Sequence, residues 1–331
     1  MDNTSLLYGG LALLAATLGT AYTILVLWSP ETIVPKPSEK TYRSAREPSK
    51  RLPLPSIDDP PSVDLTVVIP AYNETTRLPD MFSTTLAHLE AMRRATPSRT
   101  YEILVVDDGS TDGTADLALK LALDYPESDV RIVVLEKNLG KGGAVRHGML
   151  HGRGRRLLFA DADGASRFED LELLWKAMDE ISPKEEAAVV VGSRAHLVKT
   201  EAVVKRSVIR NILMYGLHTI LRIVGVGHIR DTQCGFKLFT REAARQIFPY
   251  QHLATWIFDV ELLLLAKQLA MPVAEVPIEW HEVSGSKLHV FADSLQMLRD
   301  LLILRANLLL GRWKVHQPQR PERPAANGEA K

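Results

Sequence analysis

Five short apolar runs alternate with helical patterns along residues 65–191, and this alternation restricts the fold more than any other feature of the chain. The apolar runs are residues 65–69, 103–106, 131–135, 157–160 and 187–191. The helical patterns between them cover residues 78–95, 111–123, 144–151 and 168–181. Continuous apolar runs of this length are typical of strands that are buried on both faces, as in parallel sheets. The sequence therefore predicts an α/β domain with a doubly wound, mostly parallel sheet.

A polar or glycine-rich segment follows each of the first four apolar runs. These segments are Pro70-Ala71-Tyr72-Asn73-Glu74, Asp107-Asp108-Gly109-Ser110-Thr111-Asp112-Gly113, Lys137-Asn138-Leu139-Gly140-Lys141-Gly142-Gly143 and Asp161-Ala162-Asp163-Gly164. Ligands of doubly wound sheets bind beyond the carboxyl ends of the strands. Four unrelated turns would give such a set less often than one shared site, so the sequence predicts a ligand site at this edge.

Asp161 and Asp163 directly follow the fourth apolar run. Mg²⁺ commonly takes one or two carboxylates together with the phosphate oxygens of a substrate. Taken alone, the pair fits a solvated turn as well. Together with the other strand ends, it predicts a site where a divalent cation meets a diphosphate, with Asp163 as the more direct ligand.

The glycine-rich segment at residues 140–143 opens a predicted helix. Its amides and the Lys141 ammonium group suit a phosphate, because helix N-termini attract anions. A plain helix start explains the same residues equally well. The segment is neither a Walker loop nor a dinucleotide motif, since Val145 stands where the G-x-G-x-x-G pattern requires glycine.

The N-terminal segment predicts a membrane anchor over residues 1–30. No charged residue occurs from Asn3 to Pro30, and the apolar stretch from Leu6 to Trp28 is about long enough to cross a bilayer. It is too long for a signal peptide and has no basic residue before it and no cleavage site after it. The basic residues that follow it are Lys36, Lys40, Arg43, Arg46, Lys50 and Arg51. The positive-inside rule therefore places the bulk of the chain in the cytosol.

The rest of the chain divides by composition. Residues 31–62 are rich in proline and predict a stalk. Residues 63–290 are predicted to form the folded domain, and residues 314–331 a disordered tail. Residues 203–227 predict an amphipathic helix at the membrane interface, and residues 291–313 a second, C-terminal amphipathic helix. For the second helix, packing on the domain and lying on the membrane both stay open; a buried core helix is the alternative for both.

The composition argues against a nucleic-acid-binding protein and against a disulfide-stabilised fold. Forty basic and forty acidic residues give zero net charge, without a basic tail or patch, so nothing points to nucleic acid. The single cysteine, Cys234, excludes a disulfide within the chain.

Four segments, in this order, resemble the family 2 glycosyltransferases, which have the GT-A fold. They are residues 68–74, 105–114, 138–142 and 161–163. Within the family, the chain is most similar to the members that glucosylate dolichyl phosphate. The further segments that carry this similarity are residues 163–165, 191–194, 231–237, 256–261, 279–280 and 284–287. Relatives that use GDP-mannose commonly carry Asp-Leu-Gln where this chain has Asp163-Gly164-Ala165.

The resemblance implies a reaction and a location. UDP-glucose and dolichyl phosphate would give dolichyl β-D-glucosyl phosphate and UDP, with inversion, at the cytosolic face of the endoplasmic reticulum membrane. Two alternatives stay open. One is a polyprenyl-phosphate mannosyltransferase that uses GDP-mannose, and the other is a membrane-anchored protein that binds a nucleotide sugar without turnover. The intact Asp161 and Asp163 pair argues against the second.

The resemblance also implies roles for individual residues. On the donor side, Asp107 or Asp108 accepts a hydrogen bond from uracil, and the nucleoside is lined by Pro70, Tyr72 and Glu74. Asp161 and Asp163 hold Mg²⁺ or Mn²⁺ against the diphosphate, and Asp161 also faces the ribose. Lys141 and Lys287 add positive charge there.

On the acceptor side, the nucleophile is a phosphate oxygen. Because the second pKa of a phosphate monoester is about 6, this group needs a general base less than a hydroxyl does. Asp259 is therefore expected to position the donor sugar or hold a cationic group, with a catalytic role as base left open. The cations expected near the acceptor phosphate are Arg194, Arg206, Arg210 and Arg230.

Overall fold

The structure is a computed structural model that describes residues 3–199, 229–285 and 290–315. In this part of the chain, nine strands form one sheet in the order β2-β1-β5-β4-β3-β6-β8-β7-β9. The strands are β1 Thr41–Ser44, β2 Leu52–Pro53, β3 Val63–Ala71, β4 Tyr101–Asp107, β5 Val130–Val134, β6 Gly154–Ala160, β7 Val189–Ser193, β8 Phe236–Thr240 and β9 Val273–Pro277.

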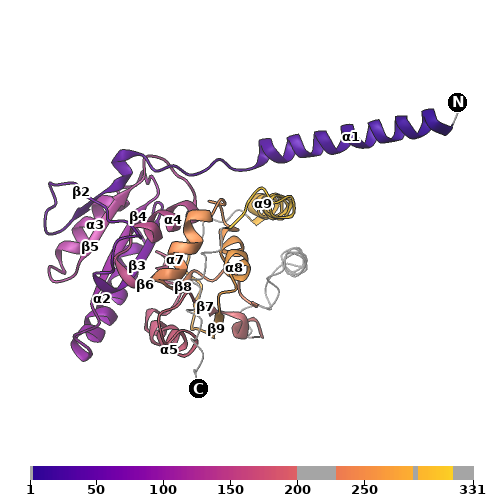
Figure 1. The fold of residues 1–331 in the computed structure, drawn as a ribbon. Helices are drawn as coiled ribbons and strands as arrows, with labels where there is room; N and C mark the ends of the chain where they lie inside the picture. Colours follow the sequence, from indigo (N-terminus) through magenta and orange to yellow (C-terminus); the bar gives the residue numbers. More distant parts are fainter. Residues whose placement is uncertain (1–2, 200–228, 286–289, 316–331) are drawn as a thin grey trace, which may run out of the picture.

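Helices cover both faces of this sheet, and α1 extends away from it (Figure 1). The α-helices are α1 Asn3–Trp28, α2 Leu78–Ala95, α3 Thr114–Leu123, α4 Lys141–His151, α5 Leu171–Ile181, α7 Arg241–Ile247, α8 Phe258–Gln268 and α9 Val290–Leu309. The 3-10 helices are η1 Pro37–Lys40, η2 Phe168–Asp170, η3 Ala195–Lys199 and η5 Phe248–Tyr250.

The central strands are buried on both faces, and alternate side chains belong to two separate cores. In β3, Val68 packs in the core that contains residues of α4, α7, α8 and α9. Its neighbours Val67 and Ile69 pack in the core with α2, α3 and α5. The apolar runs of the sequence therefore correspond to strands sandwiched between two helical layers.

Strands β5, β4, β3 and β6 are parallel, which confirms the predicted mostly parallel α/β class. Strand β8 lies antiparallel between β6 and β7, and the sequence prediction did not include it. The register of the parallel strands brings their carboxyl ends to one edge, with Ala71 of β3 opposite Asp107 of β4. The segments that follow β3, β4 and β6 therefore meet there.

Residues 31–62 are not a free stalk, so this prediction is wrong for much of the segment. Strand β1 pairs antiparallel with β5, with Arg43 opposite Ile132, and β2 pairs with β1. Glu39 is buried, and its carboxylate accepts the backbone N–H of Glu136 at 3.0 Å. Proline is compatible with an edge strand such as β2, so a high proline content does not exclude pairing at the rim of a sheet.

Helix α1 contains a stretch, Leu7–Trp28, of 22 residues with a mean hydropathy of 1.9 and none of it buried. By length and composition, this stretch is sufficient to cross a membrane. The predicted interfacial helix at residues 203–227 and the tail from residue 316 lie outside the described residues.

Candidate active site

The acidic pair lies where the sequence predicts it, at the carboxyl end of β6. The Asp161 N–H donates to the carbonyl oxygen of Gly235, which precedes β8, at 3.1 Å. The Asp161 carboxylate lies against the α-carbon of Gly235, because a β-carbon there would be 1.9 Å from Asp161 Oδ2. Glycine at position 235 is therefore required by the place of this carboxylate.

Lys141, at the first position of α4, pairs with Asp161. Its Nζ lies 2.6 Å from Oδ1 and 2.9 Å from Oδ2 of Asp161. Burial by itself lowers the pKa of Lys141, but the carboxylates of Asp161, Asp259 and Asp163 raise it above the ordinary value. Lys141 therefore remains a cation beside the acidic pair.

Asp163 is the less occupied of the two carboxylates. Its Oδ1 accepts the Ala165 N–H at 3.0 Å, and its Oδ2 lies 3.8 Å from Nη1 of Arg77. Burial and the Asp161 carboxylate raise the pKa of Asp163. Arg77 is held in place by Glu74, with Nε 2.7 Å from Oε2 and Nη2 2.5 Å from Oε1. The site therefore combines two carboxylates with two cations.

Asp108 organises the glycine-rich segment. Its Oδ1 accepts the Leu139 N–H at 2.7 Å and its Oδ2 accepts the Gly140 N–H at 2.9 Å. Its side chain is almost fully buried. This geometry argues against the base-binding role expected for Asp108. Asp107 is also buried, and its Oδ1 accepts the Ser110 N–H at 2.8 Å.

The burial of Asp108 predicts a pH-dependent change in stability. Burial, opposed by the two amide hydrogen bonds, raises the pKa of this carboxyl from 3.8 to about 7, with Asp107 and Glu39 adding to the shift. Between these values the folded protein keeps a proton that the unfolded chain has lost. The contribution of Asp108 to the free energy of unfolding therefore falls as the pH rises through this window, and it levels off above about pH 7.

In the variant Asp108→Asn, the side chain at position 108 cannot titrate, so its contribution to the free energy of unfolding does not change with pH. In urea unfolding of the full chain in detergent, the wild-type free energy of unfolding should fall relative to that of the variant as the pH rises from about 4 to about 7. A difference between the two proteins that stays constant over this range would contradict the placement of Asp108.

The start of α4 is capped by the protein itself. The N–H groups of Gly142 and Gly143 both donate to the carbonyl oxygen of Ala254, at 2.8 and 3.3 Å. A β-carbon on Gly142 would lie 2.6 Å from the β-carbon of Phe258. The glycines therefore allow a close approach of the loop before α8. These contacts favour a plain helix start over a phosphate cradle built from the amides of Gly142 and Gly143, because both N–H groups already have an acceptor.

Hydrogen bonds join the segments that follow β3 and β4. The Asn73 N–H donates to Oγ of Ser110 at 2.9 Å, and the Glu74 N–H donates to Oγ1 of Thr114 at 2.8 Å. Asn73 has a φ of 53°, which an Asn tolerates better than most residues. Pro70 is buried in β3, whereas Tyr72 is 37% exposed. Of these two, Tyr72 is the side chain accessible to a nucleoside.

Asp259 lies in the first turn of α8 and forms a buried ion pair with Lys237 of β8. Lys237 also donates to the carbonyl oxygen of Cys234 at 2.6 Å. Burial raises the pKa of Asp259, and Lys237 and Lys141 oppose this shift. Because the Asp259 side chain is 2% exposed, the structure favours the expected role of holding a cation over that of a base.

Arg194 directly follows β7 and is paired with Asp231. Nε lies 2.7 Å from Oδ2 and Nη2 lies 2.9 Å from Oδ1, and the guanidinium lies over the Trp280 ring at 5.4 Å. Burial by itself lowers the pKa of Arg194, but Asp231 more than offsets this. Arg230 is exposed. The other predicted cations, Arg206, Arg210 and Lys287, lie outside the described residues.

The family model for glycosyl transferase family 2 matches residues 66–248. The chain belongs to this family. It is 44% identical over 318 residues to dolichyl-phosphate beta-glucosyltransferase of Homo sapiens, covering 94% of this chain and 97% of that protein. It is 46% identical over 318 residues to the Saccharomyces cerevisiae protein of that name, covering 91% of this chain and 93% of that protein.

Solved structures show the fold of this family 2 glycosyltransferase. One is glucosyl-3-phosphoglycerate synthase from Mycobacterium tuberculosis in complex with Mn²⁺, UDP-glucose and phosphoglyceric acid. It has a TM-score of 0.51 and 16% identity, covering 74% of this chain and 80% of that chain. Mannosyl-3-phosphoglycerate synthase from Rubrobacter xylanophilus has a TM-score of 0.50 and 17% identity, covering 76% of both chains. The predicted GT-A fold is thereby confirmed.

The two carboxylates of this glycosyltransferase fit a divalent cation whose remaining ligands come from the substrate. No group of three or more acidic, histidine or cysteine ligands occurs in the described part of the chain. Asp161 and Asp163 supply hard oxygen ligands, which suits an ion that takes its other ligands from phosphate and water. Asp163 presents an oxygen that has only a distant contact with Arg77.

Three residues of the site were not predicted from the sequence: Arg77, Gly235 and Lys237. Each interacts with a carboxylate that the sequence did predict. A single basic residue or glycine forms no pattern on its own. For Lys237 a signal does exist, because a lysine within an apolar strand requires a buried partner.

Gly235 gives a test of the Asp161 position. In Gly235→Ala, the new methyl group would lie 2.2 Å from Cγ of Asp161 and must displace this carboxylate from Lys141. We expect glycosyl transfer to fall by more than about tenfold and the metal concentration for half-maximal activity to rise. Gly19→Ala, where nothing lies within 4 Å, is the matched control. Wild-type activity and metal dependence in Gly235→Ala would disprove the assignment.

Proposed function

We propose that this glycosyltransferase transfers glucose from UDP-glucose to dolichyl phosphate with inversion, giving dolichyl β-D-glucosyl phosphate and UDP. The observation that carries this proposal is the 44–47% identity to dolichyl-phosphate beta-glucosyltransferases, one of which aligns over 94% of this chain. The acidic pair at the end of β6, beside Lys141 and Arg77, supports a site for a sugar diphosphate.

The cations of this chain act on the leaving group. As the bond between the anomeric carbon and the diphosphate oxygen breaks, negative charge develops on UDP. Lys141 and Arg77 lie beside the acidic pair and stabilise this charge. A Mg²⁺ or Mn²⁺ ion held by Asp161 and Asp163 supplies, when bound, further stabilisation of the same oxygens.

The acceptor phosphate attacks without losing a proton. One of its oxygens forms the new bond to the anomeric carbon on the face opposite UDP, and the electron pair of the old bond leaves with UDP. Because a phosphate monoester is largely dianionic at neutral pH, no side chain has to remove a proton. The burial of Asp259 against Lys237 is consistent with a reaction that needs no general base.

The site of action that we propose is the cytosolic face of the endoplasmic reticulum membrane. The apolar stretch of α1 supports a membrane anchor, and the basic residues after it favour a cytosolic folded domain under the positive-inside rule. This orientation brings the domain to the headgroups of a lipid acceptor.

The test is a transfer assay with the full chain in vesicles that contain dolichyl phosphate. With UDP-glucose and Mg²⁺, we expect a glucosyl lipid whose anomeric proton coupling in NMR reports the β configuration. A lipid with the α configuration would overturn inversion. No glucosyl lipid under these conditions would overturn the proposed function.

A further inference from the structure

Helix α9 has apolar residues on two opposite sides. Met297, Leu301 and Leu304 face the domain and are buried. Four leucines on the other side are exposed: Leu295 by 54%, Leu298 by 37%, Leu302 by 60% and Leu309 by 69%. Their spacings of three, four and seven residues place them on one side of a helix. We call these four residues the outer leucine face.

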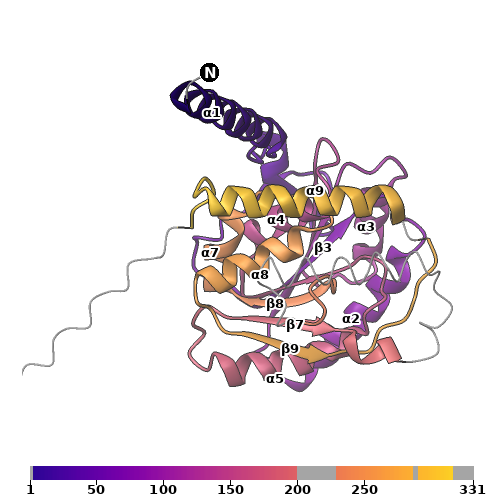
Figure 2. The same cartoon turned by 90° about the vertical axis from the view of Figure 1, so that its right-hand side faces the viewer.

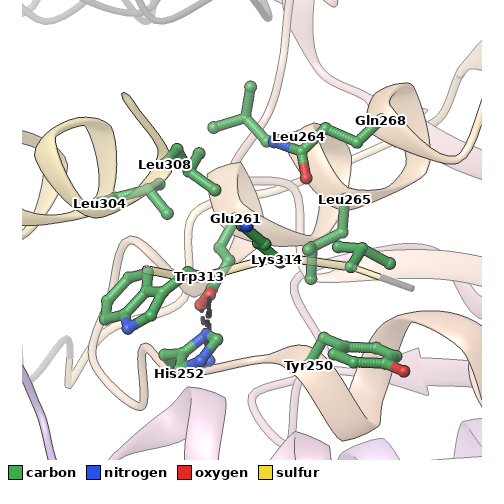
Figure 3. Close-up of a pocket in the computed structure, with 11 residues that line it drawn as sticks. Tyr250, His252, Glu261, Leu264, Leu265, Gln268, Leu304, Leu308, Trp313 and Lys314 are labelled. Atoms are coloured by element: carbon green, nitrogen blue, oxygen red, sulfur yellow. Dashed lines mark hydrogen bonds and ion pairs between the residues drawn. The ribbon is translucent and has the colours of Figure 1, made fainter. Parts of the chain in front are cut away.

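The inner side of α9 is fixed, so the helix cannot rotate to bury the outer leucine face. Oγ1 of Thr255 donates to Oδ2 of the buried Asp300 at 2.6 Å. Beyond the C-terminus of α9, the Trp313 ring stacks on His252 at 4.0 Å between centroids, and His252 contacts Glu261 of α8 (Figure 3). Leu304 and Leu308 of α9 line the shallow pocket beside Trp313 together with residues of α8.

Hydrogen bonds connect α9 and the residues after it to Ser29, which follows α1. Nδ2 of Asn307 donates to Oγ of Ser29 at 2.9 Å, and Nη1 of Arg312 lies 3.3 Å from the same oxygen. Ser29 directly follows Trp28, the last residue of the apolar stretch. Helix α9 runs across the face of the domain from which α1 departs, crosswise to α1 (Figures 1 and 2). If α1 crosses a bilayer, α9 therefore lies at the level of the headgroups.

We propose that the outer leucine face of α9 is a docking surface for the lipid bilayer, at the boundary between headgroups and acyl chains. Arg299 and Arg305 belong to the same helix. Arg299 pairs with the buried Asp300 at 2.8 Å but stays half exposed, so its guanidinium can also meet lipid phosphates. The inference deepens the proposed function and rests on it in one respect, since it describes how the domain meets the membrane that holds its lipid acceptor.

The observations favour a bilayer over a protein partner. Helix α9 lies directly beside the end of the apolar stretch of α1, because its buried Asn307 contacts Ser29. An interfacial helix requires an apolar side, a nearby cationic side chain and an axis along the membrane plane. Exposed leucines in such an array are unusual on a surface that faces only water.

The first experiment reads the environment of α9 directly and needs no activity. Cys234 is fully buried, so an introduced cysteine is the reactive one. Leu302→Cys in the full chain is labelled with the fluorophore NBD and reconstituted in phosphatidylcholine vesicles with a fraction of phosphatidylserine. We expect blue-shifted emission and quenching by doxyl-labelled lipids. Leu173→Cys, on the exposed side of α5, is the matched control and should report water.

An NBD group at position 302 that is as water-exposed as the one at position 173 would overturn the proposal. Self-association would overturn it as well: if label protection at position 302 persists in detergent and grows with protein concentration, a second copy covers the face. Because neither outcome depends on glucose transfer, failure here is distinguishable from failure of the proposed function.

The second experiment measures the effect on the reaction. The double variant Leu295→Ser and Leu302→Ser keeps α1, so the chain stays anchored. In vesicles we expect the KM for dolichyl phosphate to rise several-fold, with the KM for UDP-glucose unchanged. Leu173→Ser should change neither value. A KM for dolichyl phosphate equal to that of wild type in the double variant would contradict docking through this face.

Discussion

Replacing Asp163 with asparagine is expected to reduce glucose transfer by about 10²–10³-fold while the fold remains intact. Asp163 lies in the segment that follows β6, and its Oδ2 has only a 3.8 Å contact with Arg77. An amide keeps the shape and the hydrogen bond to the Ala165 N–H but removes the charge that a divalent cation needs. The measurement is the rate of transfer from UDP-glucose as a function of metal concentration, with circular dichroism to check the fold.

Asp116→Asn is the matched control for this variant. Its carboxylate is 80% exposed on α3 and pairs with Arg43, away from the acidic pair. We expect it to keep wild-type activity at every metal concentration. If Asp163→Asn keeps full activity with unchanged metal dependence, Asp163 is not a metal ligand.

The second large effect is on stability. Lys237→Met is expected to lower the free energy of unfolding by about 3–5 kcal/mol, because it leaves the carboxylate of Asp259 buried without its cation. Both side chains are almost fully buried, 0% and 2% exposed. The measurement is urea unfolding of the full chain in detergent. Lys120→Met, at an exposed position of α3, should change stability by less than about 0.5 kcal/mol.

The double variant Lys237→Met and Asp259→Leu separates a structural role from a chemical one. Removing both charges should restore most of the lost stability, because a buried ion pair can be replaced by apolar groups at small net cost. If Asp259 acted as a general base, the stable double variant would lose nearly all of its catalytic rate. Our account predicts a reduced but measurable rate. A Lys237→Met variant as stable as wild type would show that the pair is not needed.

The parallel part of the fold was predictable because its signals are local. The runs that form β3, β4, β5, β6 and β7 are apolar and continuous, and α2 was predicted with its observed bounds, Leu78–Ala95. Strand β8 was not predicted because Phe236–Thr240 contains Lys237, whose charge is satisfied by a residue of α8. The lysine in an apolar stretch indicates that a buried partner exists, but the neighbouring sequence does not identify that partner.

The segment before β3 was predicted incorrectly for a similar reason. Its prolines indicate a linker, but the backbone of β1 finds partners on β5, far along the chain. The glycine-rich segment stayed ambiguous in the sequence, because the group that caps it is the carbonyl oxygen of Ala254 in a distant loop. Neither contact is visible in a local pattern.

The candidate site divides in the same way. The position of Asp161 and Asp163 was predictable because both directly follow a buried strand, and ligands bind at the carboxyl ends of such strands. Asp107 or Asp108 was expected to bind uracil, whereas the Asp108 carboxylate accepts the backbone N–H groups of Leu139 and Gly140. Arg77 and Gly235 act through contacts with residues from other strands, so only the assembled sheet reveals them.

The measurement that tests the account most directly is a competition between two donors in one reaction. The full chain in vesicles with dolichyl phosphate and Mg²⁺ receives UDP-glucose and GDP-mannose at equal concentrations, each with a different radioactive label. We predict that the lipid product carries the glucose label and only a trace of the mannose label. A lipid that carries mannose in place of glucose would contradict the proposed donor, and lipid without either label would contradict the proposed reaction.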